Sequence, residues 1–170
     1  LQIATITTIC CLIISIIGSY AMTRLRFPGR KFFKTSIIFS YLIPTAVLFV
    51  PMYVFVSKLG FYDNKYALLI IYPTTVVPYC CYMLMRYFKA IPYALEEAAL
   101  IDGCTRLKSL WHIIIPIALP GIAVVATFAF TMSWNEYLYA MIMTTSGKQQ
   151  TAVVAISSFK YADSAIWGRI

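Results

Sequence analysis

The residue types best able to do chemistry stand together at positions 134 to 136, as Trp134, Asn135 and Glu136. Asn carries N–H donors and an acceptor, the Glu carboxylate accepts hydrogen bonds, and the indole, with Tyr137 and Tyr139 close behind it, offers flat faces on which a pyranose ring can stack. This mixture suits a sugar. The alternative is that the aromatic residues gather at a membrane surface and that Glu136 marks the end of an apolar segment. Both interpretations stay open from the sequence.

A polar segment at residues 91–115, followed by Pro116, interrupts the apolar second half of the chain. Pro92 suits a first helical position, and acidic residues follow where the helix dipole favours negative charge. Gly103 can take the left-handed conformation that ends a helix, and Thr105 can cap a second one. The segment therefore predicts two helices around a sharp turn, either as a docking element or as an ordinary connection between spans. The residues expected to form the docking element are Glu96, Glu97, Ala98, Ala99, Asp102, Gly103 and Pro116.

Composition places the elements around these residues in a lipid bilayer. The chain is 61% hydrophobic and 12% charged, with a mean hydropathy of +0.80, which is more apolar surface than 170 residues could bury in a globule. Segments free of charged residues each hold the roughly 20 residues needed to cross a hydrocarbon core about 30 Å thick. They predict spans near residues 1–22, 36–57, 66–86 and 117–137. We therefore expect an all-α, polytopic transmembrane helical bundle in a single domain, 1–170.

Prolines fall within the second and third predicted spans, at Pro44, Pro51, Pro73 and Pro78. Each removes a backbone hydrogen bond and tends to kink a helix, which lipid tolerates only where neighbouring protein or a watery cavity satisfies the freed carbonyl. These spans are therefore expected to face protein or a pathway.

Groups that could power transport are absent from the four charge-free segments. No Asp or Glu falls inside them, although ion-coupled transporters commonly carry such a residue within a span. The pair Gly147-Lys148 lacks the other residues of a phosphate-binding loop. His112 is expected to be an interfacial side chain. Glu96 and Glu97 point to different sides of a helix, and the cysteines lack the spacing of a zinc site. We expect no catalysis, metal or cofactor in this chain, and an energy source outside it.

The distribution of Lys and Arg predicts which side of the membrane the polar segment faces. Nine basic residues follow the first span or surround the polar segment, namely Arg24, Arg26, Arg30, Lys31, Lys34, Arg86, Lys89, Arg106 and Lys108. Four lie on the opposite side, namely Lys58, Lys65, Lys148 and Lys160. The positive-inside rule therefore makes segment 91–115 cytoplasmic. Topology accounts for most of the net charge of +8, and a nucleic-acid partner is not expected.

The run Glu97-Ala98-Ala99, followed at a set distance by Gly103 and Pro116, resembles the EAA loop of the permease subunits of bacterial ATP-binding-cassette importers. Ile115 stands where Leu is usual before the proline. Other segments look like the carbohydrate branch of these permeases, the relatives of the maltose-importer permease MalG. They are residues 19–31, 43–44, 50–53, 58–60, 88–92 and 133–140, and they come in the expected order across nearly the whole chain.

This resemblance implies a multi-pass permease of the type I importer fold in a bacterial inner membrane, forming half of the pathway for a sugar or oligosaccharide. It also implies a second, homologous permease, an extracytoplasmic solute-binding protein, and ATPase subunits that carry ATP and Mg²⁺. The EAA loop would dock on the ATPase, with Glu97 meeting a basic residue there. Neither end of the chain looks complete, so at least one further helix is expected on each side.

The alternative from another functional class is an ion-coupled secondary transporter, because broken helices also line binding sites in such proteins. A membrane scaffold without transport activity is a third possibility. Co-purification with a soluble ATPase separates the importer from both.

Overall fold

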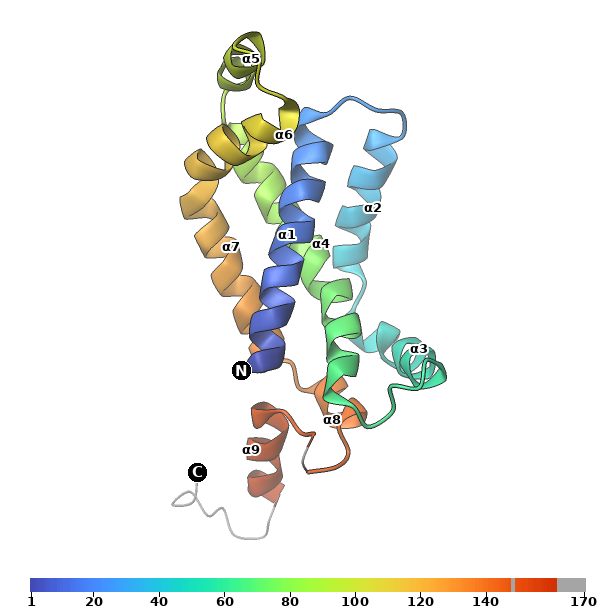
Figure 1. The fold of residues 1–170 in the computed structure, drawn as a ribbon. Coiled ribbons are helices and arrows are strands. Elements are labelled where there is room, and N and C mark those ends of the chain that lie inside the picture. Colours follow the sequence, from blue (N-terminus) through green and yellow to red (C-terminus); the bar gives the residue numbers. More distant parts are fainter. Residues whose placement is uncertain (148, 162–170) are drawn as a thin grey trace.

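The longest apolar segments of the sequence form the long helices of the structure, a computed structural model that describes residues 1–147 and 149–161. These helices are α1 (Gln2–Arg24), α4 (Leu68–Ala90) and α7 (Ile115–Asn135), and they lie side by side in one bundle (Figure 1). Each, together with the short helical turns that adjoin it, is long and apolar enough to cross a membrane. The predicted all-α membrane fold is therefore confirmed, and its first, third and fourth spans correspond to these helices.

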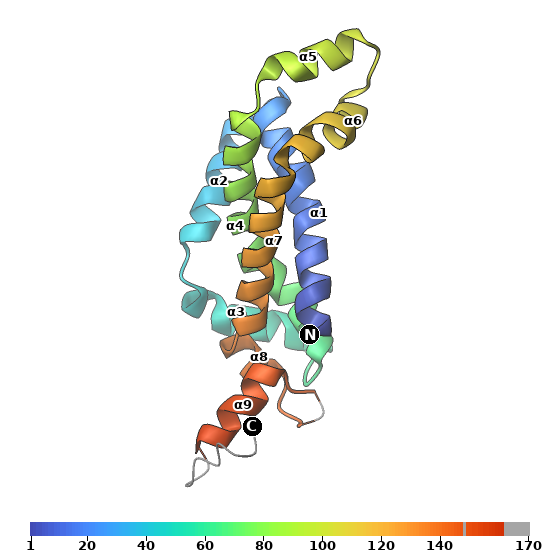
Figure 2. The ribbon, with the colours of Figure 1, turned by 90° about the vertical axis from the view of Figure 1, so that its left-hand side faces the viewer.

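The second predicted span, residues 36–57, is wrong as a single helix. Two helices occupy this region, α2 (Arg30–Leu42) and α3 (Thr45–Lys58), and they are bent by 99° relative to each other, as in a broken span or a re-entrant loop. Pro44 causes the break, because it disfavours helical geometry at Ile43, which is extended with ψ 123°. As a result α3 lies across the end of the bundle (Figure 2).

The other prolines of the predicted spans do not interrupt their helices. Pro51 lies inside α3, and α4 runs without a break through Pro73 and Pro78. The hydroxyls of Thr74 and Thr75 donate to main-chain carbonyls of the preceding turn, at 2.7 and 3.0 Å. These hydroxyls give two carbonyls near the prolines an additional donor within the helix.

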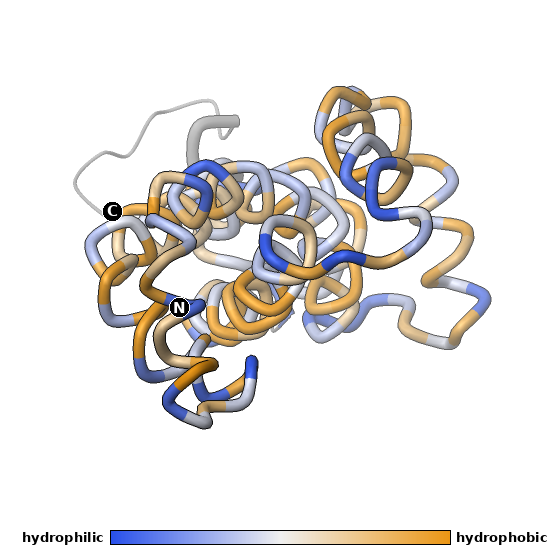
Figure 3. The backbone as a smooth tube through the Cα atoms, turned by 90° about the horizontal axis from the view of Figure 1, so that it is seen from above, coloured by the Kyte–Doolittle hydropathy of each residue, from blue (hydrophilic) through white to orange (hydrophobic). Residues whose placement is uncertain are grey.

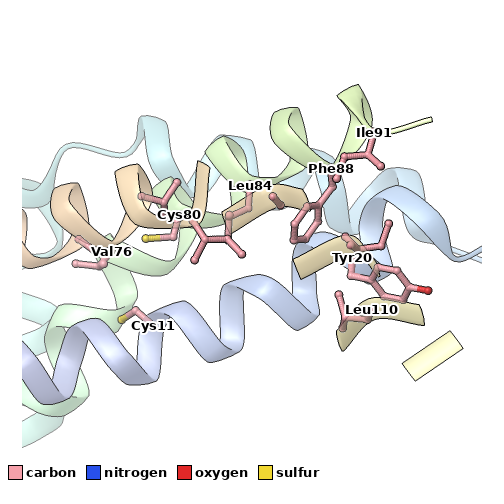
Figure 4. Close-up of a cluster of buried hydrophobic side chains, with 13 residues drawn as sticks. Cys11, Tyr20, Val76, Cys80, Leu84, Phe88, Ile91 and Leu110 are labelled. Carbon is pink, nitrogen blue, oxygen red and sulfur yellow. The ribbon is translucent and has the colours of Figure 1, made fainter. Parts of the chain in front are cut away.

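Small and polar residues hold α1 against α4. Ser15 and Ser19 are fully buried, and their hydroxyls donate across the interface to the carbonyls of Val77 and Cys81, at 3.5 and 3.1 Å. Small side chains let membrane helices approach closely, and such hydrogen bonds add to the packing. Apolar residues from α1, α4 and α7 form the core beside this interface, in which the cysteines Cys11 and Cys80 serve as small apolar groups (Figure 4).

The end of the bundle opposite the helices α5 (Tyr93–Ile101) and α6 (Arg106–Ser109) is closed by short elements. They are the turn Lys65–Ala67, the helix α8 (Leu138–Met143) and the helix α9 (Ala152–Tyr161). A second core joins α3, α4 and α8 through Val56, Ile71 and Met143. Asp63 Oδ1 accepts the N–H of Ser146 at 2.9 Å and so ties two connections that are distant in sequence.

Close contact between α4 and α7 depends on Gly121. A Cβ at this position would lie 2.5 Å from a ring carbon of Tyr87, whereas a Cβ at Gly18 would meet only the Cys81 sulfur at 3.7 Å. We expect Gly121→Ala to destabilise the bundle by about 1–3 kcal/mol because the tyrosine ring must move. Thermal unfolding in detergent measures this effect, with Gly18→Ala as the control in another spanning helix. Equal unfolding temperatures for the two variants would contradict this account of the packing.

Hydrophilic residues lie mainly in the connections, while the helices are largely apolar (Figure 3). The α1–α2 connection and the helices α5 and α6 lie at one end of the bundle, and α3, α8 and α9 lie at the other (Figure 1). Of the basic residues assigned to the outer side, Lys58 and Lys65 lie at that second end, whereas Lys148 and the side chain of Lys160 lie outside the described part of the chain.

This arrangement predicts a labelling pattern for single cysteines placed at exposed positions in a cysteine-free background. Cysteines at Lys31 and Asp102 should resist a membrane-impermeant thiol reagent in intact cells, because the positive-inside rule places them in the cytoplasm. Cysteines at Tyr62 and Ser146 should react. Permeabilised cells, in which all four should react, provide the control. The reverse pattern in intact cells would overturn the orientation.

Candidate functional site

The polar segment forms a helical hairpin at one end of the bundle, made of α5 (Tyr93–Ile101) and α6 (Arg106–Ser109). Gly103 between them has φ +86°, so the predicted left-handed conformation is present. The N–H groups of Gly103 and Cys104 donate to the carbonyls of Leu100 and Ala99, at 3.2 and 2.9 Å. This pairing is the Schellman motif, which satisfies carbonyls at a helix end.

The two ends of the hairpin are close to the prediction. Thr105 Oγ1 accepts the N–H of Lys108 at 3.3 Å, so the expected cap of the second helix is confirmed. Pro92 lies one residue before α5 rather than at its first position, with an extended ψ of 136°. It therefore sets the direction in which the chain enters the helix.

The hairpin joins α7 through a wide helical turn, Leu110–Ile114, in which the N–H of Ile115 donates to the carbonyl of Leu110. Leu110 and Ile114 are buried in the core of the bundle, and Pro116 follows at the start of α7, exposed. A wide turn relieves the clash between a proline ring and the carbonyl four residues earlier. The hairpin is thus joined to α7 by continuous helix, with His112 bonded to the carbonyl of Lys108 at 3.0 Å.

The two glutamates of α5 have opposite environments, as their adjacent positions predict. Glu96 is buried, with 3% of its surface exposed, whereas Glu97 is exposed. The outer face of α5 also presents Ala98 and Ile101, the latter with 86% exposure. Ala99 is buried, so of the two alanines only Ala98 is open to another surface. Asp102 is exposed at the turn.

Glu96 is held by residues of α1 and α6. Its Oε1 accepts the hydroxyl of Tyr20 and lies 3.6 Å from Arg106 Nη1, and its Oε2 lies 3.6 Å from Arg24 Nε. Arg24 is also buried, and its Nη2 donates to the carbonyls of Phe88 and Ile91, each at 2.6 Å. Both ion pairs in the described part of the chain involve Glu96.

Sequence reasoning missed Arg24 and Tyr20, because it treated Arg24 only as a topology signal. The available signal was their spacing: Tyr20 and Arg24 lie four residues apart, on one face of a helix, at the end of an apolar span. An arginine there needs an acceptor when neighbouring helices cover it. The buried acceptor could not be identified without the three-dimensional arrangement.

The residues proposed for a sugar lie at the far end of α7 from the hairpin. Trp134 is partly exposed and stacked on Phe130, with ring centroids 6.0 Å apart, and Asn135 is exposed. Tyr139 is buried, so it offers no free ring face, and its hydroxyl donates to the carbonyl of Thr45 at 3.1 Å. Contact between a sugar and Trp134 or Asn135 stays a prediction.

Glu136 caps α8 rather than projecting freely. Its two carboxylate oxygens accept the N–H groups of Tyr139 and Ala140, at 3.1 and 3.2 Å. Burial raises the pKa of the Glu136 carboxyl above its usual value of 4.5, and these hydrogen bonds oppose the shift only in part. A carboxylate that is already occupied in this way is less available to a ligand than Asn135.

The raised pKa of Glu136 makes a pH-dependent contribution to stability. The folded state prefers the neutral acid, so this contribution is fully present below the unfolded pKa and is lost as pH rises through the raised folded pKa. We expect Glu136→Gln, which keeps an acceptor without a charge, to gain stability relative to the unmodified protein as pH rises from 4 to 7. Glu136→Ala removes the cap and should lose about 1 kcal/mol. Unfolding midpoints at both pH values test this, and a constant difference for the Gln variant would contradict it.

Residues 13–167 match the family described as binding-protein-dependent transport system inner membrane component. The chain belongs to this family, and the resemblance found in its sequence is confirmed.

The relatives are named as transport permeases, and some of them are named for a sugar. The chain is 34% identical over 170 residues to the inner membrane ABC transporter permease protein YcjP of Escherichia coli strain K12, covering 100% of this chain and 61% of that protein. It is 32% identical to the trehalose transport system permease protein SugB of Mycobacterium tuberculosis, covering 92% and 57% of the two chains. It is 31% identical to the trehalose/maltose transport system permease protein MalG of Thermococcus litoralis, covering 99% and 61%. The chain thus spans about three fifths of the length of these relatives.

A solved structure shares the fold. It is the crystal structure of a bacterial ABC transporter involved in the import of the acidic polysaccharide alginate, with a TM-score of 0.76 and 27% sequence identity, covering 92% of this chain and 54% of that one. The relatives are named as transport permeases rather than enzymes, in agreement with the prediction that this chain is not one.

Proposed function

We propose that this chain belongs to a permease that forms half of the translocation pathway for a sugar or oligosaccharide and is driven by a separate ATPase docked on the α5–α6 hairpin. The observation that carries the proposal is the division of α5 into two faces. The inner face, with Glu96 and Ala99, is fixed to the bundle, whereas the outer face leaves Glu97, Ala98 and Ile101 free for a partner.

The connections of the hairpin suggest how ATP binding on the partner would act. α5 follows α4 through Ile91 and Pro92, and α6 continues into α7 through the turn Leu110–Ile114. Closure of an ATPase dimer would therefore move the ends of α4 and α7 and turn the cavity between the two permeases outward. A conformational change of this kind requires that the ATPase binds the two states with different free energies.

The substrate class and the other partners follow from the relatives. Among them are permeases named for trehalose, trehalose/maltose and diacetylchitobiose. We therefore propose a carbohydrate delivered by an extracytoplasmic binding protein, a second homologous permease, and ATP with Mg²⁺ bound to the ATPase. A bacterial inner membrane is the proposed location.

The energy source of uptake tests the proposal. The full-length permease, expressed with its partners, should take up labelled trehalose, maltose or diacetylchitobiose. Depletion of ATP should abolish uptake, and an uncoupler applied at constant ATP should leave it intact. Uptake that follows the proton or sodium gradient at constant ATP would instead favour an ion-coupled secondary transporter.

A further inference from the structure

We propose that Glu96 is a positioning residue that ties the hairpin to α1 through Arg24, so that movement of α5 is transmitted directly to the first span as well as to α4 and α7. This inference rests on the coupling function proposed above. It adds α1, which is not next to the hairpin in the sequence, to the elements that the ATPase would move.

Arg24 brings three helices together at one point. It is the last residue of α1, its Nη2 donates to the carbonyls of Phe88 and Ile91 at the end of α4, and its Nε faces Glu96 of α5. Helix ends leave such carbonyls without partners inside the helix, and an arginine is well suited to satisfy them. The guanidinium carbon also lies 4.1 Å from the ring centroid of Tyr93, the first residue of α5.

A second contact between α1 and the same carboxylate comes from Tyr20, one helical turn before Arg24. Its hydroxyl donates to Glu96 Oε1, and the Tyr93 hydroxyl donates in return to the carbonyl of Thr23 in α1, at 2.7 Å. Arg106 approaches the carboxylate from α6. The last turn of α1 is therefore bonded to the start of α5 in both directions.

These polar contacts, rather than apolar packing, attach α5 to the bundle. The buried residues of α5 are Glu96 and Ala99, and an alanine buries little surface. By contrast, α1 and α4 already share the serine hydrogen bonds and the apolar core described above. Loss of the Glu96 contacts should therefore free α5 from α1 while leaving the bundle itself in place.

The burial of both charges predicts the pattern of a mutant cycle. Arg24 and Glu96 are 5% and 3% exposed, so neutralising Glu96 leaves Arg24 as a buried charge without a carboxylate, and neutralising Arg24 leaves Glu96 with only the more exposed Arg106 as a cationic partner. Neutralising both removes that penalty. Each single variant should therefore impair coupling more than the double variant does. Two independent effects would instead add, and the double variant would then be the worst of the three.

The experiment uses the full transporter with Arg24→Gln, Glu96→Gln, the double variant, and Lys89→Gln as an exposed control at the end of α4. Three quantities are measured: co-purification of the ATPase, ATP hydrolysis, and sugar transported per ATP hydrolysed. Each single variant should keep the first two and lower the third about tenfold, and the double variant should recover part of the loss. Unchanged sugar per ATP in both single variants, or a double variant worse than either, would overturn the proposal. Parallel loss of all three quantities would also overturn it, because that result indicates a purely structural role.

A second measurement does not depend on the charge variants. Spin labels at Arg26, just after α1, and at Ile101, at the end of α5, report whether the two helices move together. The distance between the two labels should stay constant through the ATP cycle in the otherwise unmodified transporter. In Tyr20→Phe, which keeps both charges, the distribution of distances should become broader. A distance that changes with ATP would contradict the link. Failure of the ATPase to co-purify with the unmodified permease would instead contradict the proposed function.

Discussion

Replacing Glu97 by Lys is expected to abolish sugar uptake and sugar-stimulated ATP hydrolysis while the permease stays in the membrane at its normal abundance. Glu97 is exposed on the outer face of α5 and makes no contact that the described fold requires. By its resemblance to the EAA loop, it should meet a basic residue of the ATPase. Breaking one buried charge pair can cost about 3–5 kcal/mol, which corresponds to at least a hundredfold loss of affinity.

Quantitative co-purification of the ATPase, together with uptake, measures this effect. Glu97→Gln serves as the graded control, because it removes the attraction without adding repulsion and should lose less affinity than Glu97→Lys. Normal ATPase binding and uptake in the Lys variant would show that this glutamate does not face the ATPase.

Replacing Gly103 by Val is expected to weaken ATPase binding while leaving the spanning helices inserted. Gly103 has φ +86°, and a left-handed conformation costs a residue with a Cβ about 1–2 kcal/mol, most for a β-branched one. Apart from Gly103 and its two chain neighbours, no atom of the described residues lies within 4 Å of the position a Cβ would take, so the effect comes from the backbone rather than from a clash. The turn that orients α5 against α6 would therefore open.

The matched variant is Gly103→Asn, because Asn tolerates the left-handed region better than other residues with a Cβ. It should retain most ATPase binding where Val does not. If Asn and Val were equally harmful, the cause would be the side chain at the docking surface, and if both bound normally, the turn would not matter for docking.

The long helices were predictable because a charge-free apolar run of sufficient length has few alternatives in a membrane. The break between α2 and α3 was not, because hydropathy counts residues and carries no information on direction. Pro44 indicated a kink, but Pro73 and Pro78 gave the same signal within a helix that stays continuous. Only the surrounding packing distinguishes these cases.

The parts of the site that depend on neighbouring residues were also predictable. The left-handed Gly103 and the Thr105 cap follow from residue types and short spacing. The cap by Glu136 is of the same kind, since its partners are three and four residues away, but the sequence also allows Glu136 to bind a sugar or to mark the end of a span. The burial of Glu96 depends on Tyr20, 76 positions earlier, so it required the fold.

The most direct test of the account is to replace Ile101, the most exposed residue at the end of α5, with a photo-crosslinking amino acid in the full-length permease in living cells. Leu59, at the opposite end of the bundle and 52% exposed, is the matched control. Illumination should join the permease to an ATPase subunit from position 101 and not from position 59. A permease that still transports sugar but gives no ATPase adduct from position 101, or gives one equally from position 59, would contradict the central claim that α5 couples the pathway to ATP.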